Sequence, residues 1–93
     1  MSTKSERRAA RDVVAAYHEA RLAELLQQVG EAADRFRAGE LKAFDADQVI
    51  FQYSRAAKEL WKFCNLGEVV FTARMISEDA PDDWWERGAP NRR

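Results

Sequence analysis

One long helical pattern at the start of the chain constrains its fold more than any other feature. From about residue 5 to residue 38 the sequence is rich in Ala, Glu, Arg, Leu and Gln, which lose little side-chain freedom in a helix. Apolar residues and one histidine recur there at alternating spacings of three and four, which places them on a single stripe. The stripe consists of Val14, His18, Leu22, Leu25, Val29, Ala32 and Phe36, with Leu26 and Ala33 beside it. We therefore predict a helix over 5–38 with one buried face, continuous through Gly30.

A second helical pattern follows at about residues 46–64. Asp45, with Gln48 three residues later, has the spacing of an N-cap and its capping-box partner. The predicted inward face consists of Ala46, Val49, Ile50, Tyr53, Ala56, Ala57, Leu60, Trp61 and Cys64. Gly39 can adopt the left-handed conformation that ends a helix, and the connection over 39–45 is short. The two helices should therefore form a long antiparallel hairpin.

The remaining segments are shorter. Residues 68–78 carry β-branched residues that favour a strand, but they also form an apolar helical face. We predict a third helix there, because no second strand is available to pair with an isolated one. Pro81 then opens a short C-terminal turn that contains Trp84 and Trp85, with Asp82 or Asp83 as its cap. The fold class is therefore all-α, with residues 1–93 as a single helical domain in which residues 1–4 and 89–93 are frayed.

Composition limits the classes of function. A chain of 93 residues buries only about 60–65% of the surface that its unfolded form exposes. Its formal net charge of −1 gives no general attraction for nucleic acids or anionic lipids. The single cysteine is compatible with a reducing compartment, and no apolar run approaches the length of a membrane span. We expect a cytoplasmic protein with no membrane association.

His18 and Cys64 are the first candidates for chemistry. In the predicted hairpin they lie within about one helical turn of each other, so an imidazole beside a thiol could form a thiol-based sensor or enzyme. The simpler interpretation is a histidine hydrogen-bonded at the edge of the core and a small buried cysteine. One histidine and one cysteine do not complete a tetrahedral metal site, and we expect neither a metal nor another cofactor.

A basic strip on the outward face of the second helix is another candidate. It consists of Phe51, Arg55, Lys58 and Lys62. Lysine and arginine can contact phosphates while an aromatic ring stacks on a base, so a nucleic-acid-binding regulator is an alternative function. Such a strip is more often a solvated helix face, and no helix-turn-helix spacing accompanies it.

Large apolar side chains remain after the inward faces have been assigned. They are Val13, Tyr17, Phe71, Met75, Trp84 and Trp85. Adjacent unburied aromatics mark interaction surfaces, so we predict that these residues bind a partner chain. The tryptophan pair can alternatively fold back over the open end of the hairpin. The overhanging start of the first helix also predicts a homodimer, unless the third helix covers it.

Three short segments of the sequence resemble segments of other proteins. They are Tyr17-His18-Glu19-Ala20-Arg21, Glu59-Leu60-Trp61-Lys62-Phe63-Cys64 and Asp83-Trp84-Trp85-Glu86-Arg87-Gly88. The chain resembles small uncharacterised helical proteins of high-GC bacteria, over most of its length. That group has no established activity, so the resemblance implies no catalytic or binding residue. From the residues themselves, we expect a non-enzymatic protein-interaction module, such as an antitoxin-like protein or a regulatory adaptor.

Overall fold

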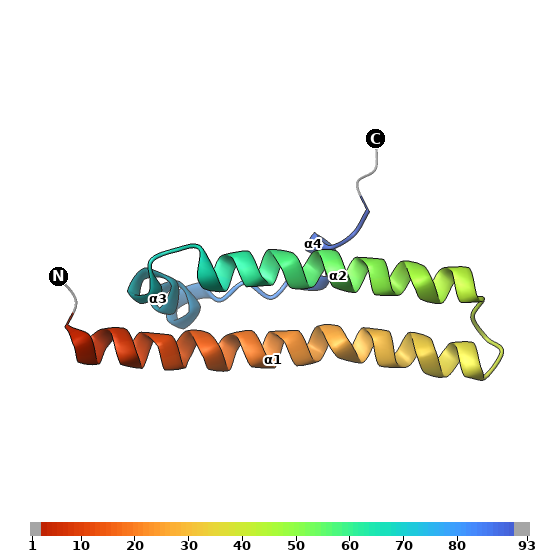
Figure 1. The fold of residues 1–93 in the computed structure, drawn as a ribbon, viewed down its shortest axis with the longest axis horizontal. Helices are drawn as coiled ribbons and strands as arrows, with labels where there is room; N and C mark the ends of the chain where they lie inside the picture. The colour runs from red at the N-terminus through yellow and green to blue at the C-terminus, as the bar shows by residue number, and fades with distance from the viewer. Residues whose placement is uncertain (1–2, 91–93) are drawn as a thin grey trace.

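The computed structural model describes residues 3–90 of the 93-residue chain, and within that range every regular element is a helix. The helices are α1 (Lys4–Arg37), α2 (Ala43–Asn65), α3 (Val69–Asp79) and α4 (Trp84–Arg87). Helices α1 and α2 lie side by side as a long hairpin, with α3 at the end near the N-terminus and α4 behind α2 (Figure 1). The predicted all-α fold with a hairpin, a shorter third helix and a tryptophan-containing turn is confirmed.

Helix α1 begins at a complete capping box. The Thr3 hydroxyl group accepts a hydrogen bond from the backbone N–H of Glu6, and the Glu6 carboxylate accepts one from the N–H of Thr3. These bonds satisfy two N–H groups that a helix end otherwise leaves unpaired. Thr3 and Lys4, which the sequence predicted to be frayed, are therefore the cap and the first residue of α1. The fraying expected at residues 1–2 and 91–93 lies outside the described residues.

The turn between the long helices differs from its prediction in one respect. Gly39 has a φ of 78°, and α1 continues through Gly30, as expected. The assignment of Asp45 as N-cap is wrong, because α2 begins at Ala43 and Lys42 caps it without a side-chain hydrogen bond. Asp45 lies instead in the first turn of α2, where its negative charge interacts favourably with the helix dipole.

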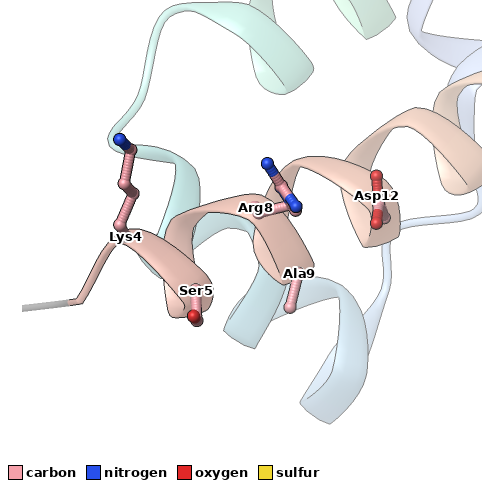
Figure 2. A pocket seen from close by; sticks show the side chains of 5 residues that line it. All are labelled: Lys4, Ser5, Arg8, Ala9 and Asp12. Atoms are coloured by element: carbon pink, nitrogen blue, oxygen red, sulfur yellow. The ribbon is translucent and has the colours of Figure 1, made fainter.

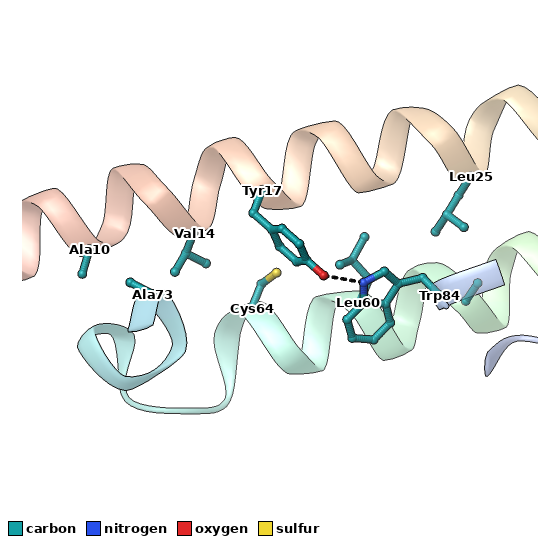
Figure 3. Packing of buried hydrophobic residues seen from close by; sticks show 9 residues of the cluster. Ala10, Val14, Tyr17, Leu25, Leu60, Cys64, Ala73 and Trp84 are labelled. Atoms are coloured by element: carbon teal, nitrogen blue, oxygen red, sulfur yellow. Dashed lines mark hydrogen bonds between the residues drawn. The ribbon is translucent and has the colours of Figure 1, made fainter. Parts of the chain in front are cut away.

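Helix α3 covers the start of α1. The Glu68 carboxylate caps α3 by accepting a hydrogen bond from the backbone N–H of Val70. Ala73 of α3 is buried in the same cluster as Ala10 and Val14 of α1 (Figure 3). Packing against α1 thus outweighs the strand propensity of this segment. In the same way α3 covers Ala10 and Val14 of the overhang, while Val13 stays 38% exposed, and the dimer predicted there stays a prediction.

Tyr17 and Trp84 connect the C-terminal segment to the hairpin. The Trp84 Nε1 atom donates a hydrogen bond of 2.7 Å to the Tyr17 hydroxyl group, which in turn donates to the carbonyl oxygen of Pro81 (Figure 3). The Phe63 ring lies 5.9 Å from the ring centroid of Tyr17 and 5.4 Å from that of Trp84. Burial raises the pKa of Tyr17, so its hydroxyl group keeps its proton at neutral pH and can donate. We call Tyr17, Phe63, Pro81 and Trp84 the aromatic clasp.

Within residues 3–90, no third helix covers the half of the hairpin that is nearer its turn. The molecule measures 55 × 30 × 18 Å, and its radius of gyration is 16.2 Å. A compact domain of this length would have a radius of gyration of about 12 Å. The difference arises because α3 packs near the start of α1 and α4 packs near the middle of the two long helices (Figure 1). Within residues 3–90, no helix is both long and apolar enough to cross a membrane.

Candidate functional site

The six residues predicted to bind a partner do not form one surface. Tyr17 and Trp84 are only 9% and 2% exposed, so their assignment to an exposed set is corrected: both belong to the core. Trp85 is half-buried against that core. The sequence raised the possibility that the tryptophan pair folds back, and the structure shows that Trp84 does so.

Three of the six residues remain accessible. Phe71 is 58% exposed, and Met75 and Val13 are each 38% exposed. Phe71 and Met75 are four residues apart on α3 and therefore share one helix face, opposite the buried Ala73. We call Phe71 and Met75 the α3 patch. Val13 lies on α1, next in sequence to the buried Val14.

The C-terminal segment is held against α2 by polar contacts. The Gln52 Nε2 atom donates a hydrogen bond of 2.9 Å to the carbonyl oxygen of Trp85, and Arg55 Nε donates one of 2.6 Å to that of Gly88. Gly88 lies so close to α2 that an added Cβ atom would be 2.4 Å from the backbone oxygen of Gln52 and 2.6 Å from the backbone nitrogen of Ala56. Up to Gly88, this segment is part of the folded domain and is not a free binding arm.

A larger exposed apolar set lies on the hairpin, where the sequence predicted burial. Leu26 and Phe36 of α1 are each 49% exposed, and Ile50 and Trp61 of α2 are 50% and 51% exposed. The predicted inward position of Ile50 and Trp61 is therefore only half right. Both lie at the edge of the inward face of α2, and the helical period alone does not show whether another element covers that edge.

The structure places His18 and Cys64 together, as predicted, but not in a reactive environment. Both line one shallow pocket, which Arg11 and Asn65 also line. Burial raises the pKa of the Cys64 thiol to about 11, whereas a reactive cysteine needs a lowered pKa. Among the described residues, no group of three or more His, Cys, Asp and Glu side chains is arranged to hold a metal ion.

The basic strip is partly engaged by other groups. Arg55 is hydrogen-bonded to Gly88, and the Lys62 ammonium group lies 3.1 Å from the carboxylate of Glu59. Lys58 is exposed, and Phe51 is 52% exposed. The carboxylate of Glu59 therefore lies beside Lys62 of the strip, where it reduces the local positive potential that phosphate binding requires.

A concave region at the start of α1 is lined by Lys4, Ser5, Arg8, Ala9 and Asp12. All five residues come from the same helix, as Figure 2 shows. Ligand sites are usually clefts lined mainly by apolar side chains from several elements. One largely polar helix face does not provide such a cleft, and we assign no site here.

Comparison of the chain with protein-family models, curated proteins and solved structures finds no match. The resemblance to small helical proteins of high-GC bacteria stays a prediction. The candidate site therefore depends on the surface of the molecule alone, namely the α3 patch and the exposed apolar side chains of the hairpin.

Proposed function

We propose that this protein is a non-enzymatic protein-interaction module, an antitoxin-like protein or a regulatory adaptor, that binds a partner chain through the α3 patch. The observation that carries the proposal is the exposure of Phe71 and Met75 on one face of α3. A phenylalanine and a methionine side by side can enter an apolar groove of a partner, and methionine adapts its shape to the contact. A cytoplasmic location is part of this proposal, supported by the single cysteine.

The aromatic clasp supports the proposal through its effect on the scaffold. Hydrogen bonds of Tyr17 and Trp84 hold the C-terminal segment on the hairpin, and Ala73 fixes α3 on α1. The α3 patch is therefore presented on a helix whose opposite face is already packed. Binding to a prearranged surface loses less conformational entropy than binding through a free tail.

For each alternative function, one observation weighs against the proximity of His18 to Cys64 or the exposure of Lys58. The raised pKa of Cys64 works against a thiol sensor, and the contacts of Arg55 and Lys62 work against a phosphate-binding strip. A partner chain remains the function that accounts for the exposed apolar side chains.

The proposal can be tested by affinity capture from lysate of the source cells with the full-length chain. We expect the Phe71→Glu, Met75→Glu double variant to lose a protein that the unmodified chain retains, because the two charges would be buried without partners. Phe44→Glu is the matched control, since Phe44 is 85% exposed and lies at the opposite end of the molecule. Equal capture by all three proteins would contradict the proposal.

A further inference from the structure

Several of the exposed apolar residues of the hairpin lie on one continuous face. Positions three, four and seven apart share a face of a helix, so Leu22, Leu26, Val29 and Ala33 form one stripe of α1, and Ile50, Ala57 and Trp61 form one stripe of α2. Helix α4 packs against the other side of α2, at Gln52, Ala56 and Phe63. In Figure 1 the chain reaches α4 behind the hairpin. We call these two stripes the open face.

The two stripes lie level with each other along the hairpin. His18 and Cys64 line one pocket, so facing positions of the two antiparallel helices have residue numbers that add up to about 82. By this register Leu26 lies beside Ala57, and Gly30 lies beside Ser54. The smallest side chains of the region thus lie near the centre of the open face, and the larger ones lie on either side.

The open face has the dimensions of a small specific interface. From Glu19 to Arg37 it extends about 27 Å at 1.5 Å per residue, and two helices give it a width of about 20 Å. Two such faces in contact would cover about 1,100 Å² in projection, close to the lower limit of stable interfaces. On either side of its centre the face is apolar and half-exposed, with Leu26, Ile50 and Trp61 each about 50% exposed.

We propose that the open face binds the open face of a second copy of this chain, to form a homodimer with a four-helix core. This interface is separate from the α3 patch, so the inference goes beyond the proposed function. The two-fold axis crosses the helices near position 28 of α1, and each long helix packs antiparallel to its counterpart in the other copy. The second copy thereby supplies a third and a fourth helix to the half of each hairpin near its turn, which no other helix of residues 3–90 covers.

The charges at the two ends of the open face favour a second copy of this chain as its binding partner. One face of α1 carries four residues at spacings of seven, four and seven, namely Glu19, Leu26, Gly30 and Arg37. The two ends of this face therefore carry opposite charges. Antiparallel pairing about position 28 places Glu19 of each copy beside Arg37 of the other. Within residues 3–90 the carboxylate of Glu19 makes no ion pair, and Arg37 makes only an exposed one with Asp34.

The same antiparallel pairing places large side chains of one copy opposite small ones of the other. It places Leu26 of one copy over Gly30 of the other, where a Cβ atom would find no neighbour within 4 Å. A glycine lets a facing helix approach closely. By the same register, position 61 of one copy lies opposite position 47 of the other, so the Trp61 side chain meets the smaller Asp47 and lies about one helical turn from Ile50. Ser54 lies at the two-fold axis and faces its own counterpart.

Analytical ultracentrifugation of the full chain tests the interface. We expect a dimer at about 100 µM, and a dissociation constant raised at least tenfold in Ile50→Glu and in Leu26→Glu, because each places an unpaired carboxylate at the centre. Both side chains are about half-exposed in the monomer, so circular dichroism should show unchanged helix content. The matched control Phe44→Glu, on a different face of α2, should remain dimeric.

Charge reversal tests the antiparallel arrangement independently of any core substitution. Glu19→Arg and Arg37→Glu should each weaken the dimer, by about tenfold for the two symmetric contacts, and the double variant should recover most of the loss. In Ser54→Cys, mild oxidation should join two copies by a disulfide across the axis, whereas the buried Cys64 stays unreactive.

The outcomes separate this inference from the proposed function. A monomer at about 100 µM, or a dimer that neither Ile50→Glu nor Leu26→Glu weakens, would overturn the open face as a homodimer interface. A dimer that Phe71→Glu dissociates would overturn it as well, because it would place self-association on α3. Capture of a partner protein depends on Phe71 and Met75 and should persist in Ile50→Glu, so either proposal can fail while the other stands.

Discussion

At the scale of single residues, Tyr17 joins two segments that are far apart in the sequence. Its hydroxyl group accepts a hydrogen bond from Trp84 and donates one to the carbonyl group of Pro81. Trp84 is almost completely buried, so its N–H group has no access to water if the tyrosine oxygen is removed. The stability of the C-terminal segment therefore depends strongly on one oxygen atom.

We expect Tyr17→Phe to lower the free energy of unfolding by about 1–3 kcal/mol, because it leaves a buried N–H donor without a partner. Urea denaturation followed by tryptophan fluorescence measures the change. Tyr53→Phe is the matched control, since Tyr53 is partly exposed, and it should change stability by less than about 0.5 kcal/mol. Equal changes in the free energy of unfolding for the two variants would show that the hydroxyl group of Tyr17 contributes little to stability.

Cys64 should react slowly with alkylating agents in the folded protein. Burial raises its pKa from about 9 to about 11, so the thiolate fraction at pH 8 is about 100-fold lower than that of a free thiol. Iodoacetamide kinetics should show this slow rate in the native chain, an ordinary rate in urea, and no change in His18→Ala. A fast native rate that His18→Ala abolishes would restore the thiol-sensor alternative.

The raised pKa of Cys64 also determines a dependence of stability on pH. As the pH rises above about 9, the unfolded thiol loses its proton before the folded one, so the unfolded state binds fewer protons. The free energy of unfolding should therefore fall between about pH 9 and pH 11 and be unaffected by this group below pH 9.

At the scale of elements, the short α4 depends on its contact with α2 more than on its own sequence. Its N-cap Asp83 makes no side-chain capping bond, and a helix of four residues is not stable alone. Gly88 lets the chain approach Gln52 and Ala56 closely, and hydrogen bonds from Gln52 and Arg55 hold it there. The position of α4 is thus set by packing.

Gly88→Ala should destabilise the fold by about 1–3 kcal/mol, because the new methyl group would overlap the backbone of α2. The thermal unfolding midpoint measures the effect. Gly67→Ala is a matched control, because its Cβ atom would meet only the hydroxyl group of Thr72, at 3.1 Å, and a smaller loss is expected. If Gly88→Ala is as stable as the unmodified protein, the close packing of Gly88 against α2 does not determine the position of α4.

At the scale of the whole molecule, the C-terminal segment closes the core of the hairpin. The buried cluster takes side chains from all four helices, including Leu25, Leu60, Ala73 and Trp84. A chain of this size has few such contacts to lose. The long helices alone would expose the faces that α3 and α4 now cover.

Removal of the residues after Asp79 should therefore broaden the unfolding transition and lower its midpoint, since it deletes Trp84 and exposes Tyr17. Circular dichroism during heating measures this effect. A chain ending at Pro90 keeps every described contact of α4 and should unfold like the full chain. A cooperative transition at an unchanged midpoint in the shorter chain would contradict this role.

Most of the helical fold could be predicted because its signals are local. Apolar spacing identified α1 and α2, Gly39 identified the turn, and the lack of a pairing strand identified α3 as a helix. The start of α2 was predicted three residues too late. Asp45 is a residue type that often caps helices, but the residue at the N-cap position is Lys42. Local signals define which segments are helices better than they define the residue at which each begins.

The sequence by itself determined the hairpin and the excess of large apolar side chains, since helical period and composition are properties of neighbouring residues. Only the tertiary structure decided which of those side chains are free. Tyr17 and Trp84 became core because α4 folds back over α2, whereas Ile50 and Trp61 stayed half-exposed because none of the four described helices covers that edge. Exposure depends on which distant segments cover a face, and the period of a single helix does not contain that information.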